Sequence, residues 1–445
     1  MSRLHLRRIA APALAVSLSM GVAVLGLTAA SATAAGSPGV TNTSITIGAT
    51  VPLTGIASTG YNEVAKAANA VFKYVNSKGG INHRKINYIL KDDCYNTPGF
   101  GCTGTPNTTT QTQALLAVPV FATVGSLGTP TQESVRNLLK SHGVPQLFVN
   151  SGSEAWNNPS HYPMLFGWQQ SYIVESKILG TYMNKHLKGK KLCFLGQNDD
   201  FGGGGLQGLK DVHANPALVQ KYSVTSLVLG GAAYFTPFIK AEQTASCKVV
   251  FLDTIPGATA AALGNAAALS FHPQWVISSV GSDPITLHKE SSAVNDVGAI
   301  TFAELPASTD TNPWNAWDRK VLLADPADFP GFTATTPMDG NMAYGIGWGV
   351  SFVEALRAEG KNVTRAGFVA TLLKTTFQTP ALTPLKYSKS NHEGLLGGYV
   401  DTVTSQTATT AVAGKTVYVT TPTTSSKVVV THKVSTSVPA WLQPG

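Results

Sequence analysis

The sequence is poor in charged residues and lacks the short motifs that mark several common classes of enzyme. Charged residues make up 13% of the 445 residues, compared with about 25% in an average globular protein. No Gly-Lys-Ser/Thr follows the glycine-rich stretch 202–205, so it is not a phosphate-binding loop, and no G-x-S-x-G hydrolase elbow is present. We therefore expect no enzymatic activity and no cofactor.

Patterns typical of metal sites are also missing. The cysteines form no C-x-x-C pair and the histidines show no ligand spacing, so we expect no metal. Asp92 and Asp93 are adjacent, but neighbouring residues of a strand point to opposite faces of a sheet. We therefore interpret these two aspartates as a strand end near the rim of a cleft, and not as a catalytic or metal-binding pair.

Basic residues are scattered along the chain. The formal net charge is +8, and the one small cluster, His83–Lys85, fits a single surface turn. Binding of nucleic acid is therefore not expected. After the first 35 residues, no run approaches the roughly 18 uninterrupted apolar residues that a membrane span needs.

Residues 1–35 predict a secretory signal peptide. They combine three arginines, an apolar middle and the small-residue exit Ala32-Thr33-Ala34, which is the pattern of a cleaved signal. A transmembrane anchor is the alternative, but the apolar run is short and rich in Ala and Gly. No Cys follows the run as a lipid-attachment site, and we expect the mature protein to be secreted or otherwise outside the cytoplasm.

The four cysteines are an even number in a chain expected to reach an oxidising compartment. Cys94 and Cys102 enclose a Pro/Gly-containing loop that can fold back, which predicts a disulfide. Cys193 and Cys247 each lie in a strand-like run. They form a second disulfide if those strands are neighbours, and are two buried thiols otherwise.

Short apolar strands alternate with amphipathic helices from Ser44 onward, which predicts βαβ units and parallel sheets. The rhythm breaks near 166–170 and again near 300–306, so we expect two Rossmann-like lobes: 36–167 and 168–302, with 303–400 returning to the first lobe and 401–445 forming edge strands and a tail. Thr129 is expected to cap a helix, with Gln132 as its capping-box partner. Expected strands are 44–53, 86–93, 120–128, 144–152, 190–197, 222–230, 247–254 and 273–280, and expected helices are 63–80, 108–118, 129–143, 171–189, 205–214, 234–245, 257–269, 339–360 and 364–376.

Small polar residues follow three of the expected strands. Ligands of open parallel sheets bind beyond the carboxyl ends of the strands, where helix N-termini present free N–H groups. Gly128 and Thr129 lie at one such end, and Ser151, Gly152 and Ser153 (151–153) lie at the next. Phe201 follows the first expected strand of the second lobe. Each alone fits an ordinary capped loop, but three converging ends indicate a binding cleft.

The chain resembles the branched-chain amino-acid type of ABC-transporter solute-binding proteins, which have the type I periplasmic-binding-protein fold. The resemblance is carried by "ITIGATVPLTG", "VNSKGGINHRKINYILKDDC" and "ATVGSLGTPTQESV", with "VPQLFVNSGSEA" and "LCFLGQNDDFGGGGLQGLK" behind them, and covers most of 44–400. It implies two hinged lobes that close on a small ligand.

The resemblance also implies positions for the ligand-binding residues. A carboxylate end of the ligand would be held by Thr129, Ser151 and Ser153, while Phe201 would line the cleft. The remaining implied positions are Thr59, Tyr61, Asp253 and Ile255.

One departure from the family pattern concerns the ammonium group of an amino acid. The acidic residue that would hold it has no counterpart at Ser279 and Val280, and Asp283 comes a few residues late. Because a buried ammonium without a carboxylate is costly, either Asp283 or Asp253 takes this role or the ligand is not an α-amino acid.

Three functions are compatible with these features. The favoured one is a monomeric binding protein that delivers a small ligand to an ABC-transporter permease. The alternatives are a ligand sensor of the same fold and, disfavoured by the missing nucleophile–base motifs, a secreted hydrolase.

Overall fold

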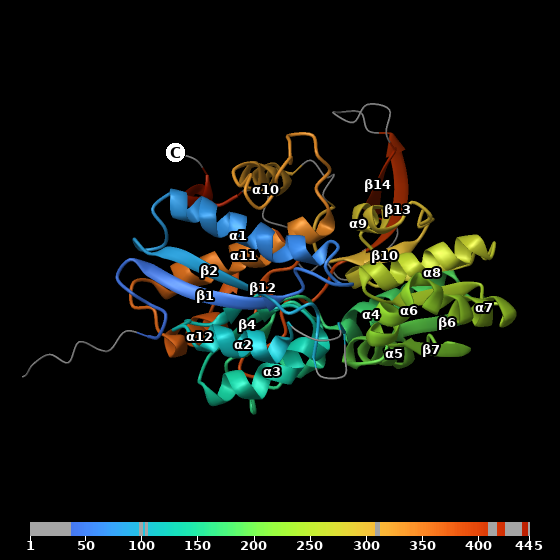
Figure 1. Ribbon diagram of the computed structural model, residues 1–445, viewed down its shortest axis with the longest axis horizontal. Coiled ribbons are helices and arrows are strands. Elements are labelled where there is room, and N and C mark those ends of the chain that lie inside the picture. The colour runs from blue at the N-terminus through green and yellow to red at the C-terminus, as the bar shows by residue number, and fades with distance from the viewer. Residues whose placement is uncertain are drawn as a thin grey trace, which may run out of the picture. The chain divides into compact units, whose positions relative to one another are not determined.

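The computed structural model describes residues 37–97, 101–102, 106–307, 312–407, 416–422 and 438–443. The predicted signal peptide lies outside these residues. Strands and helices alternate through most of the described chain and build two lobes, each around its own sheet, shown side by side in Figure 1. The predicted two-lobed α/β class is confirmed.

The first lobe is built on a five-stranded sheet in the order β2-β1-β3-β4-β5, and every paired strand is parallel. The interior strand β1 is buried along most of its length, because helices cover both faces of a parallel sheet. The strand predicted at 120–128 is regular only over Thr123–Val124, although Phe121 and Gly125 beside it still donate backbone hydrogen bonds to the neighbouring strands β1 and β4. The strands are β1 Ser44–Val51, β2 Lys85–Asp92, β3 Thr123–Val124, β4 Gln146–Val149 and β5 Leu165–Gly167.

Helices cover both faces of this sheet. Helix α1 buries its apolar stripe and packs closely on α11, where a Cβ on Gly345 would lie 2.0 Å from the carbonyl oxygen of Val64. In Figure 1, α1 lies on the opposite side of the sheet from α2 and α3. The helices of this lobe are α1 Tyr61–Ser77, α2 Thr108–Leu116, α3 Thr129–Ser141, η1 Glu154–Trp156, α10 Pro313–Leu323, α11 Gly340–Glu359, α12 Arg365–Lys374 and η4 Ala440–Leu442, accompanied by the hairpin strands β11 Thr376–Phe377 and β12 Leu385–Lys386.

The second lobe is built on a seven-stranded sheet in the order β14-β13-β10-β9-β8-β6-β7. The strands from β10 to β7 pair in parallel, whereas β13 runs antiparallel to both β10 and β14. Of β13 and β14, only β14 is at an edge of the sheet, so the prediction of edge strands after 401 is wrong for β13. The strands are β6 Leu192–Gln197, β7 Leu218–Tyr222, β8 Val249–Asp253, β9 Gln274–Ile277, β10 Ile300–Ala303, β13 Tyr399–Thr407 and β14 Thr416–Pro422.

The glycine-rich stretch of the second lobe is helical, although it was expected to be a turn. Asp199 caps helix α5 by accepting a hydrogen bond from the N–H of Phe201, and the four glycines follow within the helix. A Cβ on Gly202 would lie 2.2 Å from the carbonyl oxygen of Gln197, and one on Gly208 would lie 2.4 Å from that of Ile173. The glycines therefore let α5 approach β6 and α4. The helices of this lobe are α4 Tyr172–His186, α5 Asp200–Asp211, α6 Val224–Gly230, η2 Gly231–Phe235, α7 Thr236–Thr244, α8 Pro256–Ala268, η3 Ser279–Gly281 and α9 Pro284–Glu290.

The expected strand 222–230 is also wrong, because β7 ends at Tyr222 and α6 begins at once. Ser223 caps α6 by accepting a hydrogen bond from the N–H of Ser226, and Val224 and Leu227 are buried. At α3 the cap is one residue earlier than predicted, at Gly128, and the Gln132 side chain donates to Thr50 of β1 instead of closing a capping box.

The structure contains both disulfides. Cys94–Cys102 closes the loop after β2, and Cys193–Cys247 joins β6 to the chain two residues before β8. The two strands are neighbours, as the second pairing required.

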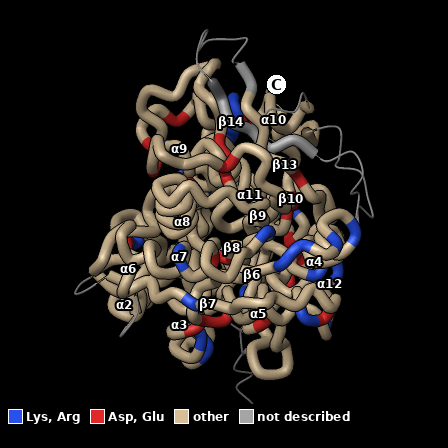
Figure 2. Tube along the Cα trace, turned by 90° about the vertical axis from the view of Figure 1, so that its right-hand side faces the viewer, with Lys and Arg blue, Asp and Glu red and all other residues tan. Residues whose placement is uncertain are grey.

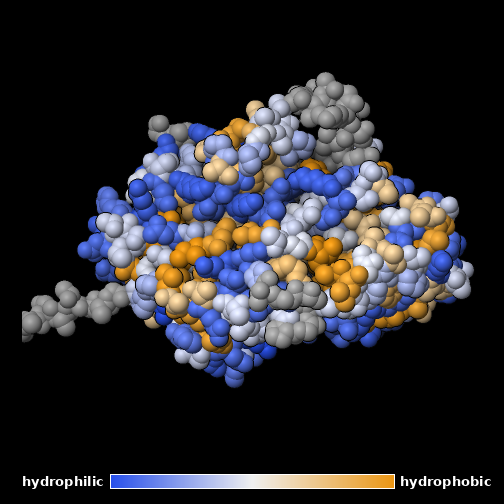
Figure 3. All heavy atoms as spheres, viewed as in Figure 1, coloured by the Kyte–Doolittle hydropathy of each residue, from blue (hydrophilic) through white to orange (hydrophobic). Residues whose placement is uncertain are grey.

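One described helical stretch, Val224–Thr244, has the length and mean hydropathy of a membrane span. It consists of α6, η2 and α7, includes Lys240 and Glu242, and packs on α8, so length and composition are its only membrane-like properties. On the face drawn in Figure 3, hydrophobic residues lie in separate patches among hydrophilic ones. The end formed by the second lobe carries interspersed Lys, Arg, Asp and Glu (Figure 2).

Candidate ligand-binding site

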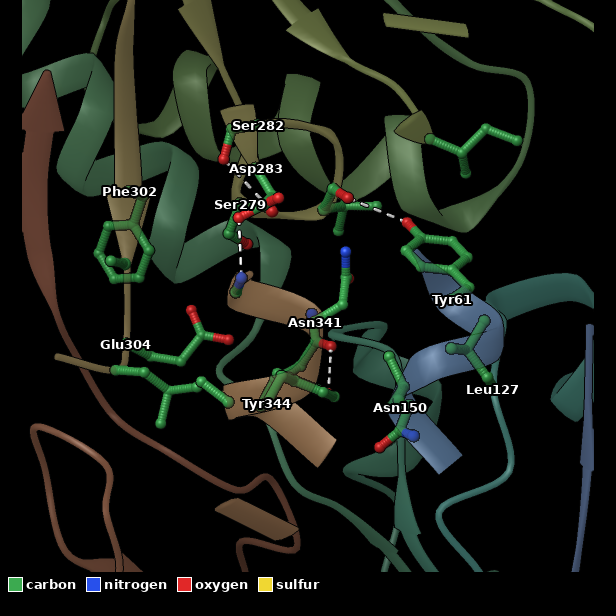
Figure 4. Close-up of a pocket in the computed structure, with 18 of the residues that line it drawn as sticks. Tyr61, Leu127, Asn150, Ser279, Ser282, Asp283, Phe302, Glu304, Asn341 and Tyr344 are labelled. Atoms are coloured by element: carbon green, nitrogen blue, oxygen red, sulfur yellow. Dashed lines mark hydrogen bonds between the residues drawn. The ribbon is translucent and has the colours of Figure 1, made fainter. Parts of the chain in front are cut away.

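A cavity of about 150 Å³ lies between the two lobes. Its wall comes from loops that follow β3, β4, β8, β9 and β10, and from the first turns of α1, α3, α5 and α11. The cavity therefore lies at the carboxyl ends of strands of both sheets, where ligands of parallel α/β sheets bind. Figure 4 shows side chains from both lobes pointing into it.

The first-lobe wall includes Gly128 and Thr129, as predicted. Gly128 has φ +111°, and a Cβ there would lie 2.5 Å from the ring of Tyr95, so only glycine lets the chain enter α3 here. The Thr129 and Ser151 hydroxyls share a hydrogen bond of 2.7 Å, and the Tyr172 hydroxyl lies 3.5 Å from both. These hydroxyls are thus joined before any ligand arrives.

The residues predicted at the next strand end, Ser151, Gly152 and Ser153, are not part of the cavity wall. Ser151 stands behind Thr129, and the Ser153 hydroxyl caps η1 and donates to Glu133. Gly152 is packed so tightly that a Cβ would lie 2.4 Å from the carbonyl oxygen of Gln170. The predicted direct contacts of these three residues with ligand are therefore not supported, because their polar groups bond within the protein.

The loop before α1 contributes one of its two predicted residues. Tyr61 lines the cavity, whereas Thr59 is half-buried outside it. The Tyr61 hydroxyl donates to the carbonyl oxygen of Val280 across the cleft at 3.0 Å.

On the second lobe, Phe201 and Ile255 line the cavity as predicted, and the Phe201 ring packs on that of Tyr172 with centroids 4.6 Å apart. Asp253 does not line it. Its carboxylate points at α5, where a Cβ on Gly205 would lie 1.8 Å from Oδ2, and burial raises its pKa well above the usual value. Asp253 is therefore not placed to hold a ligand's ammonium.

Several cavity residues were missed by the sequence reasoning. Tyr95 follows Cys94 in the disulfide loop, Tyr172 opens α4, and Tyr344 lies in the first turns of α11, where its hydroxyl donates to Gln169 at 2.7 Å. Tyrosines near helix starts were the available signal, but they are common elsewhere in the sequence. Also missed were Asn150, Gln169, Ser282, Glu304 and Asn341.

Two carboxyl groups face the cavity. Asp283 accepts hydrogen bonds from the N–H groups of Thr286 and Gly340, and burial raises its pKa to about 6. Glu304 follows β10, and burial raises its pKa to about 8, with the nearby Glu175 adding to the effect. Among the described residues that line the cavity there is no Lys, Arg or His.

Hydrogen bonds and an ion pair join the lobes beside the cavity. Gly340 of α11 donates to Asp283 at 2.8 Å, and Lys289 of α9 lies 2.9 Å from Asp339 and 3.2 Å from Glu63. Together with the bond from Tyr61 to Val280, these contacts describe lobes closed upon the cavity.

Asp92 and Asp93 bind backbone and loop groups, and not each other. Asp92 accepts from the N–H groups of Leu53 and Thr54, while Asp93 accepts from the N–H of Tyr95 and the hydroxyl of Thr108. Within the described part of the chain, no group of three or more His, Cys, Asp or Glu side chains could hold a metal ion.

The sequence profile described as Periplasmic binding protein matches residues 44–408 of this chain. The chain belongs to the periplasmic binding protein family. This periplasmic binding protein therefore belongs to a family of extracytoplasmic solute-binding proteins. No curated protein matches its sequence.

Solved structures share its fold at low sequence identity. A fatty acid ABC transporter substrate-binding protein from Thermomonospora curvata is 19% identical, with TM-score 0.70 over 90% of this chain and 97% of the other. A branched-chain amino acid ABC transporter protein from Thermus thermophilus with bound valine is 17% identical, with TM-score 0.67 over 88% and 97%. A solute-binding protein from R. palustris in complex with benzoate is 16% identical, with TM-score 0.64 over 84% and 95%.

Proposed function

We propose that this periplasmic binding protein captures a small polar organic ligand, an amino acid or a related compound, between its lobes and delivers it to an ABC-transporter permease. The observation that carries the proposal is the cavity of about 150 Å³ enclosed by residues of both lobes. A cavity of this size holds a benzene-sized molecule, and so it suits a ligand with a short side chain better than one with a long acyl chain.

The wall provides for such a ligand. Val64, Leu127, Phe201 and Ile255 offer apolar surface, and Thr129 at the start of α3 offers a hydroxyl beside the free N–H groups of the helix. The bonds between lobes form only when the lobes approach, so a ligand that fills the cavity favours closure.

We further propose that the lobe built on the five-stranded sheet moves as one body against the lobe built on the seven-stranded sheet, which includes β13 from Tyr399 onward. Residues 1–35 would direct export and be removed. The exported protein would act as a monomer. Export is tested by N-terminal sequencing of the protein recovered from the extracytoplasmic fraction, and a start at Met1 contradicts it.

Calorimetry and small-angle scattering test the binding function together. A panel of amino acids, amines, amides and small organic acids is titrated against the purified protein, and each compound that binds is then examined by scattering. We expect at least one compound to bind and to reduce the radius of gyration. If nothing in the panel binds and no compound compacts the protein, the proposed function is wrong.

A further inference from the structure

The charge of the cavity is one-sided. Its ionisable side chains, apart from tyrosines whose pKa values are raised by burial, are the carboxyl groups of Asp283 and Glu304. No basic side chain among the described lining residues offsets them. An anionic ligand would therefore be buried beside two acids without a cation, which is unfavourable.

The buried acids around the cavity differ in how they are bonded. Glu175, behind the wall, accepts hydrogen bonds from the N–H and the hydroxyl of Ser279, and Asp283 accepts from two backbone N–H groups. The Glu304 side chain differs, because no other residue among those described donates a hydrogen bond to its carboxyl group.

Glu304 is also aimed at the empty space. The residue is 6% exposed, and its carboxylate points into the cavity beside Tyr344 (Figure 4). A buried carboxyl that meets no other side-chain donor costs free energy unless a ligand supplies one. Asn150 lines the same cavity, and its Oδ1 has no hydrogen-bond partner, so a second acceptor is available.

Resting on the proposed function, we propose that Glu304 is the counter-ion of the ligand, and that the ligand is an organic amine whose positively charged nitrogen lies against this carboxylate. Tyr344 lies beside this carboxylate, and the rings of Tyr61 and Tyr172 line the same cavity, where aromatic faces attract cations. The apolar body of the ligand lies on Leu127 and Phe201. A carboxylate on the ligand is dispensable, and the charged nitrogen is not.

Three ligands with the same branched hydrocarbon body separate the two poles. Isopentylamine carries only the amine, 4-methylpentanoate only the carboxylate, and leucine both. Isothermal titration of the full chain as exported is expected to show binding of isopentylamine and no binding of 4-methylpentanoate. Tighter binding of the acid than of the amine would overturn the proposal, and this comparison needs no variant.

The variant Glu304→Gln tests the residue itself. Glutamine keeps the shape and removes the charge, so amine affinity is expected to fall about 10- to 100-fold, the range for a hydrogen bond to a charged group. The matched control is Glu242→Gln, which changes another buried glutamate outside the cavity, bonded to Gln220. It should leave amine affinity unchanged, and unchanged affinity in Glu304→Gln contradicts the proposal.

The panel distinguishes this inference from the proposed function. If the protein binds and closes on a compound that has no positively charged nitrogen, the function stands and the role of Glu304 is wrong. If no compound binds, both are wrong. If the bound compounds are amines and Glu304→Gln weakens them selectively, both are supported.

Discussion

Individual side chains decide how firmly the lobes close over the cavity. The Tyr61 hydroxyl is the clearest case, because it belongs to α1 of the first lobe and donates a hydrogen bond to the carbonyl oxygen of Val280 in the second. A net hydrogen bond contributes about 1 kcal/mol. Since this bond exists only when the lobes meet, its energy should appear in ligand affinity.

We therefore expect Tyr61→Phe to weaken the binding of any ligand that closes the lobes about fivefold, the equivalent of roughly 1 kcal/mol. The matched control is Tyr88→Phe, whose hydroxyl makes a bond of the same length, 3.0 Å, to Val124 inside the first lobe. That variant should lower the melting temperature while leaving affinity unchanged. Calorimetry on both variants checks the prediction, and equal affinities for Tyr61→Phe and wild type would contradict it.

At the same scale, the sequence predicted some cavity residues and not others for a physical reason. Thr129 and Phe201 begin helices directly after strands, and the geometry of parallel sheets brings such positions to the cleft. Tyr344 reaches the cavity only because a later segment of the chain folds back on the first lobe. Glu304 directly follows β10, but the sequence pattern at 300–306 indicates a crossing between the lobes and not a strand. Ser153 follows β4 and Asp253 is the last residue of β8, but local bonds to η1 and packing against α5 turn their side chains away.

At the scale of the elements, the lobes are held together where α9 of the second lobe meets α1 and the start of α11 in the first lobe. Lys289 has 42% of its side chain exposed, but Asp339, to which it bonds at 2.9 Å, is fully buried. Glu63 belongs to the same cluster, and burial, together with Asp339, raises its pKa to about 8. Without the lysine, the closed form would hold two neighbouring acids unpaired.

Replacing Lys289 by Met should therefore favour open lobes. We expect a cost of about 1–2 kcal/mol to the closed form, between the values for surface and buried pairs, and a larger radius of gyration without ligand. Lys177→Met is the control, because its 2.8 Å pair with Asp211 has the same lysine exposure but lies within the second lobe. Small-angle scattering of both variants tests this, and an unchanged radius of gyration in Lys289→Met would show that Lys289 does not hold the lobes closed.

Elements were predictable where the pattern was long and local. Helices α1, α3 and α11 and the strands between them follow hydrophobic periodicity, and the two lobes follow from their alternation. The failures lie where tertiary contacts override propensity. Four glycines became part of α5 because that helix must approach β6, and the β-branched run after Tyr222 became α6 because Ser223 caps it.

For the molecule as a whole, several buried acids with raised pKa values determine how stability depends on pH. Burial raises the pKa of Asp93 and of Glu175 to about 7, and the pKa of Glu242 and of Glu304 to about 8. These groups are spread over both lobes, so their effect falls on global stability. Asp339 and Glu63 raise the pKa of Lys289, so this lysine titrates only at higher pH and does not offset the buried acids.

The sign of that effect follows from linkage. An acid whose folded pKa lies above its unfolded value of about 4 does not lower the free energy of unfolding at low pH, where it is protonated in both states. As pH rises from about 4 towards the folded pKa, only the unfolded state releases the proton, and the free energy of unfolding falls. We therefore expect the free energy of unfolding to fall by several kcal/mol between about pH 5 and pH 8 and to level off above that.

Urea denaturation at intervals of pH measures this. Glu242→Gln should make the decline shallower by matching wild type at pH 5 and exceeding it at pH 8. Stability that rises from pH 5 to pH 8 would show that these carboxyl groups do not govern the pH response.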